Sequence, residues 1–354
     1  MPEERSPTIE ELGDADGLRA QWSRLAQRSR RIFATQEWVD AWWRHHGEGR
    51  EAVTLGCYDA DGVLIAIVPL CVARERPIRV ARFAGYGPSD ENGAIGAPQD
   101  APAALPAAIA SWGRGGVLLA DRLVGDVDWA GAMHGTELGR ESSPVIDLAG
   151  QDWEEYLASR SSNFRSQVRR KERKLVRDEG LCYRLCDDPE RLDADLSTLF
   201  SLHRARWGSE RSGAYDGARG RFHRDFAATA LERGWLRLWI AEVRGEPIAA
   251  WHGFRFADAE LYYQFGRDPT WDRASIGIVL LAHTIRAAAD DGVPLYRLLR
   301  GGESYKQRFA TSDPGVVTVA AASGIYGRAA IFAARAVLAL PAPVRRVATS
   351  RAAR

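Results

Sequence analysis

The sequence contains little cysteine and no long hydrophobic run. Its four cysteines form no CxxC pair and no Cys/His cluster at metal-ligand spacing: Cys57, Cys71, Cys182 and Cys186. This argues against a structural zinc site and a disulfide scaffold. The most apolar stretch, residues 329–340, is interrupted by Arg335 and followed by Pro341. It is shorter than the ~20 apolar residues that a membrane-spanning helix needs.

The first residues, MPEERSPTIEELGDADG, lack the apolar core of a secretory signal. We therefore expect a cytoplasmic protein with reduced thiols. The sequence leaves open a peripheral position at the inner membrane face, through the basic segments described next.

The chain carries almost no net charge, with 48 Lys and Arg against 47 Asp and Glu. This balance conceals two cationic segments. Residues 160–177 hold eight Lys or Arg and one acid, Glu172, and the chain after Asp313 holds six Arg and no acid. Such segments are compatible with a solvated helix face, with pairing to the acidic remainder, or with an anionic donor, substrate or membrane surface. No motif for sequence-specific binding of nucleic acid is present.

The length of 354 residues is about twice that of a typical domain. Residues 52–87 and 236–269 each predict two strands joined by a tight turn and then a third strand, and the turn residues Gly62 and Gly245 lie 183 positions apart. A duplicated α/β domain explains this agreement. We predict mixed, mainly antiparallel sheets with helices on both faces, in lobes 1–150 and 151–325, followed by a basic amphipathic tail, 326–354.

Three further segments complete this organisation. Residues 35–46 predict a helix on which Trp38, Trp42 and Trp43 pack into the core or, alternatively, form a binding surface. Between the halves, residues 152–179 and 189–207 predict helices. The Gly- and Ser-rich residues 208–220 that follow are a candidate lid, although a surface linker has the same composition.

The segment RDPTWDRASIG, residues 267–277, leads from a strand into a helix predicted over 275–290. The first backbone N–H groups of a helix have no partner within it and bind phosphate or carboxylate groups well. Ser275 can cap the helix, Gly277 permits close approach of a ligand, and a cation precedes them. The candidate anion-binding residues are Arg273, Ser275, Ile276 and Gly277.

A second candidate site is GGESYKQRF, residues 301–309, which follows a predicted strand. Glu303, Tyr305 and Lys306 would place a proton acceptor, a proton donor and a cation at one sheet edge. Alternatively, Glu303 and Lys306 form an exposed pair on a helical turn.

Proton transfer at such a site needs a general base. The sequence contains no Gly-x-Ser-x-Gly elbow that would present a serine nucleophile. Glu303 is the first candidate base, followed by Glu242 and His252 on strands of the second half.

The second half of the chain resembles the CelD-like acetyltransferases of the GNAT superfamily. The resemblance lies in the order of its segments: a hairpin, an RDP loop, a helix that starts with S-x-G and is buried, a strand, and the motif G-x-E-x-Y-K-x-R-F. These acetyltransferases are related to the Fem-type aminoacyl transferases, which carry two tandem GNAT-like lobes. The basic segment SRSSNFRSQVRRKERKLVRDEG resembles the helix that opens the second lobe in those proteins. The likeness spans residues 33–322.

This resemblance implies that Ser275 and Gly277 receive the pyrophosphate of an acyl-CoA, most simply acetyl-CoA, and that Tyr305 and Lys306 flank the transfer centre. Acyl transfer to an amine needs a base, donors for an oxyanion and an acid for the leaving group, and direct attack needs no acyl-enzyme. We expect no metal. The chain departs from the family in reading Ser-Ile-Gly at 275–277, where members usually have Ser-Pro-Gly, and in lacking a second glycine there. Candidate substrate-binding residues are Arg169, Arg170, Tyr263 and Arg308.

The expected function is transfer of an acyl group to an amine or hydroxyl of a saccharide, envelope precursor or small metabolite. Two alternatives remain open. One is a Fem-like transferase that uses aminoacyl-tRNA as donor. The other is a catalytically silent adaptor in polysaccharide biosynthesis.

Overall fold

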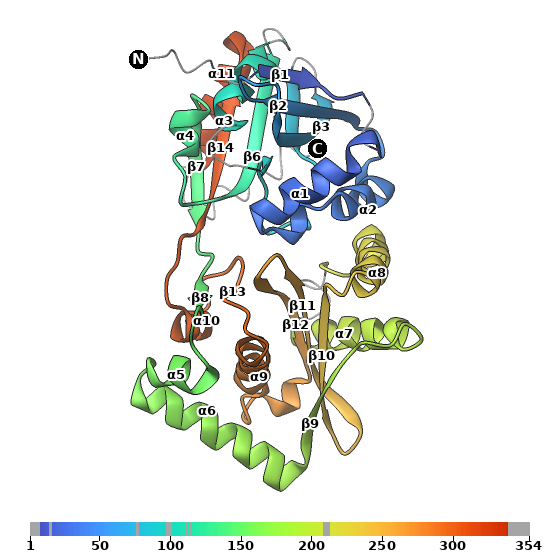
Figure 1. Ribbon diagram of the computed structural model, residues 1–354, viewed down its shortest axis with the longest axis vertical. Helices are drawn as coiled ribbons and strands as arrows, with labels where there is room; N and C mark the ends of the chain where they lie inside the picture. Colours follow the sequence, from blue (N-terminus) through green and yellow to red (C-terminus); the bar gives the residue numbers. More distant parts are fainter. Residues whose placement is uncertain are drawn as a thin grey trace.

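The computed structural model describes residues 8–13, 16–75, 78–96, 101–110, 112, 115–207 and 213–338. They form two lobes, each built on one sheet (Figure 1). Part of the candidate lid, residues 208–212, and part of the predicted tail, residues 339–354, lie outside this description. No helix within these ranges is long and apolar enough to cross a bilayer.

The first sheet has the strand order β1-β2-β3-β4-β6-β14-β7, with β5 paired to β3. Its pairs are antiparallel except β4 with β6. The strands are β1 (Thr8–Glu11), β2 (Glu51–Tyr58), β3 (Leu64–Glu75), β4 (Ile78–Phe83), β5 (Ile95–Gly96), β6 (Gly116–Val124), β7 (Thr136–Glu141) and β14 (Val316–Ala322). The accompanying helices are η1 (Asp16–Leu18), α1 (Arg19–Ser29), η2 (Ile32–Ala34), α2 (Gln36–His46), α3 (Ala101–Ala110), α4 (Trp129–Ala132) and α11 (Gly324–Leu338).

The second sheet has the order β8-β13-β12-β11-β10-β9, and only β12 with β13 is parallel. Its strands are β8 (Val145–Asp147), β9 (Leu181–Leu185), β10 (Leu236–Val243), β11 (Glu246–Phe256), β12 (Ala259–Arg267) and β13 (Leu295–Arg297). The accompanying helices are α5 (Trp153–Ala158), α6 (Ser162–Lys174), the π-helical turn η4 (Leu175–Glu179), α7 (Leu192–Trp207), α8 (Gly217–Glu232), η5 (Pro269–Trp271), α9 (Ile276–Asp290) and α10 (Ser304–Phe309).

The two lobes repeat one plan. In each, an antiparallel hairpin and a third strand lead into a helix and then a strand parallel to the third: β2, β3, β4, α3 and β6, and again β10, β11, β12, α9 and β13. The hairpin turns use Gly62 (φ 75°) and Gly245 (φ 82°), because this left-handed conformation is easy only for glycine. The predicted fold class, two tandem lobes with mixed sheets, is confirmed.

Each sheet also takes one strand from the other half of the chain. Strand β8 precedes the second lobe's helices but pairs with β13, where Ile146 lies opposite Tyr296. Strand β14 follows the second lobe but lies between β6 and β7 in the first sheet. The predicted lobes 1–150 and 151–325 divide the chain once, near residue 150. In the structure, β8 lies before this division but belongs to the second sheet, and β14 lies after it but belongs to the first sheet.

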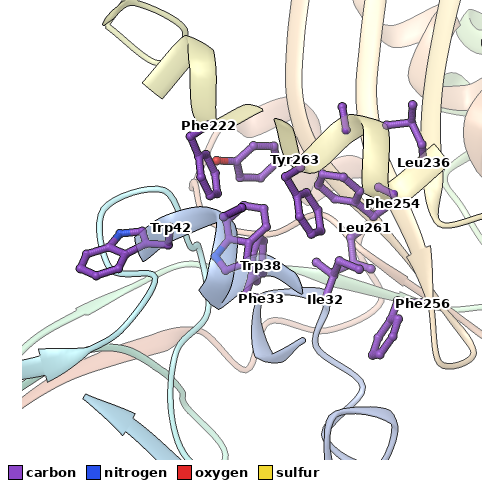
Figure 2. Packing of buried hydrophobic residues seen from close by; sticks show 14 of the residues in the cluster. Ile32, Phe33, Trp38, Trp42, Phe222, Leu236, Phe254, Phe256, Leu261 and Tyr263 are labelled. Atoms are coloured by element: carbon purple, nitrogen blue, oxygen red, sulfur yellow. The ribbon is translucent and has the colours of Figure 1, made fainter. Parts of the chain in front are cut away.

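One hydrophobic core continues from lobe to lobe (Figure 2). Trp38 of α2 is fully buried, as predicted, and its ring centroid lies 4.8 Å from that of Phe222 and 4.7 Å from that of Phe226, both on α8. Trp38 Nε1 also donates a hydrogen bond to Ser89 Oγ at 2.8 Å. This core therefore holds the segment around Ser89 at the boundary between the lobes.

Candidate active site

The first part of the site is the amino end of α9. Ser275 occupies the N-cap position with φ 60°, and its hydroxyl bonds Lys171 Nζ instead of capping the helix. The N–H groups of Ile276 and Gly277 stand in the first turn, where a helix offers them no acceptor. A Cβ at position 277 would lie 3.3 Å from the ring of Phe265, so glycine here lets β12 and α9 approach closely.

This helix start opens into a cavity of about 270 Å³. Tyr305 reaches the cavity from α10, so the predicted anion-binding and acyl-transfer segments meet in one place. The lining residues are Arg206, Tyr262, Phe265, Arg267, Asp272, Ser275, Gly277, Ile278 and Tyr305.

Two tyrosines at the cavity share a hydrogen bond. The hydroxyls of Tyr305 and Tyr262 lie 3.1 Å apart. Burial raises the pKa of Tyr305 far above its usual value, and the neighbouring Tyr262 raises it further. Tyr305 therefore keeps its proton at neutral pH and can donate it.

Lys306 follows Tyr305 and is buried, with 5% of its surface exposed. Its Nζ donates to the Arg300 carbonyl oxygen at 2.8 Å and lies 3.3 Å from Glu303 Oε2. Burial lowers the pKa of Lys306, and the Glu303 carboxylate opposes this by raising it. The pair thus differs from the exposed helical pair considered as an alternative, because its ammonium is enclosed.

Gly301 makes this arrangement possible. Its φ of 129° is a conformation that other residues rarely adopt. A Cβ there would lie 2.2 Å from Glu303 Oε2 and 3.0 Å from Lys306 Nζ. Glycine at this position therefore leaves room for the Glu303–Lys306 pair.

The first lobe contributes Asp90, which sequence reasoning missed. Its Oδ1 lies 3.7 Å from Arg300 Nε and 3.9 Å from Arg122 Nη1. Burial raises the Asp90 pKa to about 6, although Arg300, Arg122 and Lys306 each lower it. The available signal was a short run of four polar residues, 89–92, between Pro88 and Gly93. The structure buries all four.

A cationic groove of about 590 Å³ lies between α6 and η5. Its walls include Arg170, Lys171, Lys174 and Arg273. Because Lys171 also bonds Ser275, the groove and the cavity lie on the two sides of one contact. Two predicted binding residues, Arg170 and Arg273, therefore stand beside the cavity.

Part of the basic helix is neutralised within the protein. Arg169 pairs with Glu154, and the one acid in the run, Glu172, bonds Arg286 at 2.8 Å. Arg308, a candidate substrate-binding residue, instead bonds Gln167 and lies over the ring of Phe164. Half of the six cations of α6 thus line the groove.

Three other candidate residues line neither the cavity nor the groove. Glu242 Oε1 lies 3.3 Å from Arg184 Nε, in an ion pair between β10 and β9. His252 is 1% exposed, and its Nδ1 lies 3.0 Å from the hydroxyl of Tyr215. Burial lowers the His252 pKa to about 3, so the ring is neutral and a weak base. Tyr263 donates its hydroxyl to the Pro88 carbonyl at 2.8 Å and so joins the lobes.

The described part of the chain contains no group of three or more His, Cys, Asp or Glu side chains that could hold a metal ion. All four cysteines are free thiols, and only Cys182 is exposed.

Comparisons with known proteins agree with this geometry. Residues 162–307, which include the cavity, the groove and Lys306, match the acetyltransferase (GNAT) domain family. No curated protein matches the sequence significantly.

Several solved structures have similar folds at low sequence identity. A crystal structure of FemX is 11% identical, with a TM-score of 0.63 over 92% of this chain and 100% of that chain. A tandem GNAT protein from the clavulanic acid biosynthesis pathway is 12% identical, with a TM-score of 0.53 over 90% and 99%. The C-terminal domain of a putative lysylphosphatidylglycerol synthetase from Agrobacterium fabrum is 11% identical, with a TM-score of 0.55 over 87% and 94%.

At these identities the structural neighbours establish the fold, and the family model matches the part of the chain that includes the cavity and the groove. Residues 162–307 are therefore similar to the acetyltransferase (GNAT) domain family, within a chain whose fold resembles those of FemX and of a tandem GNAT protein.

Proposed function

We propose that this protein transfers an acyl group from acyl-CoA, with acetyl-CoA as the expected donor, to an amine or hydroxyl of a small acceptor. The observation that carries the proposal is the meeting of the α9 cavity with the cationic groove at the contact between Lys171 and Ser275. Coenzyme A joins a slender thiol arm to a pyrophosphate and a phosphorylated nucleoside. It therefore suits a narrow recess that adjoins a cationic surface.

The residues at this junction fit such a donor. The first-turn N–H groups of α9 can bind the pyrophosphate, assisted by the positive end of the helix dipole. Arg170, Lys174 and Arg273 line the groove and supply charge for the remaining phosphate. When bound, the donor supplies a thioester carbonyl that an amine can attack directly.

The chain's own residues then have separate tasks. Tyr305, which keeps its proton, donates it to the leaving thiolate. The enclosed ammonium of Lys306 stabilises the negative charge that develops on the carbonyl oxygen. Glu303, whose side chain is 41% exposed, accepts the proton of the attacking group, and Asp90 is the second carboxylate available for that task.

A recess at the lobe boundary is the candidate acceptor site. It has a volume of about 420 Å³, and its two arginines, Arg50 and Arg219, outnumber its one acid, Glu48. The other lining residues are Trp42, His45, His46, Tyr86, Gly87 and Pro88. Aromatic rings and cations together suit an acceptor with a ring and an anionic group. This composition supports a charged saccharide or envelope precursor over an uncharged metabolite.

The donor is tested by thermal unfolding of the full chain with acetyl-CoA, coenzyme A and 3′-dephospho-coenzyme A. At one hundred times Kd, a ligand stabilises the folded state by about 2.7 kcal/mol. We expect acetyl-CoA to raise Tm and Arg170→Ala to weaken its binding severalfold. Arg173→Ala is the matched control, because Arg173 lies exposed on the same helix and does not line the groove.

The same experiment separates the alternatives. The donor would be aminoacyl-tRNA if two results are obtained. Acyl-CoA would not stabilise the protein, and aminoacyl-tRNA would bind in a salt-sensitive way that Arg170→Ala weakens. A catalytically silent adaptor would be favoured if wild type and Lys306→Ala both bind acetyl-CoA but neither releases coenzyme A when an acceptor is added.

A further inference from the structure

Helix α11 carries an apolar surface that the active site does not use. Of the seven large apolar side chains that are exposed in the described part of the chain, four belong to this helix: Ile325, Tyr326, Phe332 and Leu338. Ile325 is 66% exposed and Phe332 is 76% exposed. The only buried residue of the helix is Gly327.

The outward side chains form a continuous ridge. Ile325, Ala329, Phe332 and Ala336 are spaced four, three and four residues apart, and this spacing places them on one side of a helix. All four are exposed. A mostly apolar helix thus turns an apolar stripe toward solvent.

The opposite side of α11 is seated on the first sheet. A Cβ at Gly327 would lie 2.7 Å from the Gly116 carbonyl oxygen and 3.0 Å from Cβ of Ala322, so the helix backbone lies close to β6 and β14. Figure 1 shows α11 on the first lobe, far from α6 and α9 of the second lobe. The seat fixes which side of α11 faces outward, and the cavity at α9 stays clear of it.

Every charge on and after this helix is positive. Arg328 and Arg335 are seven residues apart, beside the ridge, and both line a groove of about 610 Å³ that also contains His134. The sequence has no acidic residue after Asp313, and residues 339–354 add four arginines. A partner that binds this surface must offer an apolar region for the ridge and negative charge for the arginines.

We propose that α11 docks the first lobe onto a bilayer surface that contains anionic lipid. A 15-residue helix is about 22 Å long and lies in the plane of the interface. Ile325 and Phe332 enter the boundary between headgroups and acyl chains, while Arg328 and Arg335 contact lipid phosphates. The proposal is independent of the proposed enzyme activity, because it uses the first lobe alone.

Co-sedimentation of the full chain with vesicles tests this surface. We expect binding to phosphatidylcholine vesicles that contain a quarter phosphatidylglycerol, weak binding to pure phosphatidylcholine, and release at high salt. Ile325→Glu with Phe332→Glu should abolish binding. Arg328→Ala and Arg335→Ala should each weaken it roughly fivefold, the effect of about 1 kcal/mol per cation near an anionic surface.

Val63→Glu is the matched control, since Val63 is also an exposed apolar residue, 56% exposed, but lies between β2 and β3. It should bind vesicles as wild type does, and all variants should keep the wild-type Tm. Failure of wild type to bind the anionic vesicles would overturn the proposal. So would undiminished binding by the double glutamate variant, or a concentration-dependent dimer that this variant alone abolishes.

Discussion

Gly301 offers the sharpest test of the Glu303–Lys306 arrangement. Gly301→Ala places a methyl group where it would lie 2.2 Å from Glu303 Oε2, at a φ of 129°. The backbone strain alone costs about 1–3 kcal/mol. The methyl group must also displace the carboxylate, the ammonium or both.

These quantities predict a small loss of stability and a large loss of activity. With an unfolding entropy of about 2.1 cal/mol/K per residue, a strain of 1–3 kcal/mol lowers Tm by roughly 1–4 °C in a chain of 354 residues. A reacting group displaced by about 1 Å costs up to 10²-fold in rate. We expect kcat to fall ten- to one-hundredfold.

The assay measures thiol release from acetyl-CoA with an acceptor chosen from a panel of anionic amino sugars and amino acids, beside thermal unfolding. Gly302→Ala is the control, because a Cβ there would meet no atom nearer than 3.5 Å and the residue has no positive φ. It should keep activity within about twofold of wild type, as unstrained surface changes do. Equal turnover by the two folded variants would refute the role given to Gly301.

Two further variants test the boundary between the lobes. Burial raises the Asp90 pKa from 3.8 to about 6, so its contribution to stability is full below about pH 4 and is lost as the pH rises through 6. We measure the free energy of unfolding in urea for Asp90→Asn and wild type. The variant's free energy of unfolding should rise by about 3 kcal/mol relative to that of wild type between pH 4 and pH 8. A difference between the two proteins that does not change with pH would contradict the raised pKa. Glu91 is 1% exposed and its Oε1 lies 2.9 Å from Arg297 Nη2, so Glu91→Gln should cost about 3–5 kcal/mol by leaving the guanidinium unpaired. Adding Arg297→Met should recover part of that cost, and additive losses in the double variant would argue against the pair.

Sequence reasoning succeeded where the signal lies within a short segment. The duplicated plan followed from two hairpins with alternating strands and turn glycines at matching positions. A helix start and a double glycine marked the segments of Ser275 and Tyr305, and both residues line one cavity, while their roles stay predictions. The cavity that unites those segments follows from β12 and β13 being neighbours in one sheet.

The features that were missed depend on contacts between distant parts of the chain. Asp90 approaches Arg300 because the lobes pack through Trp38 and the aromatic side chains of α8, and no local pattern encodes that distance. The burial of His252 likewise depends on Tyr215 and His223, which lie about 30 residues or more before it in the sequence. The residue pattern of β14 predicts a strand, but it does not reveal which strands pair with it.

The exchanged strands govern how this protein can be made. Ala322 pairs with Val117, and among the described strands β7 pairs only with β14. The first sheet therefore stays incomplete until nearly all of the described chain has been synthesised. Until then β6 presents an open edge, which is prone to pair with other chains. Contacts this distant in sequence also slow folding. A cut at residue 150 removes β14 from one half and β8 from the other, so the halves are poor candidates for separate expression, and the whole chain is the unit of folding.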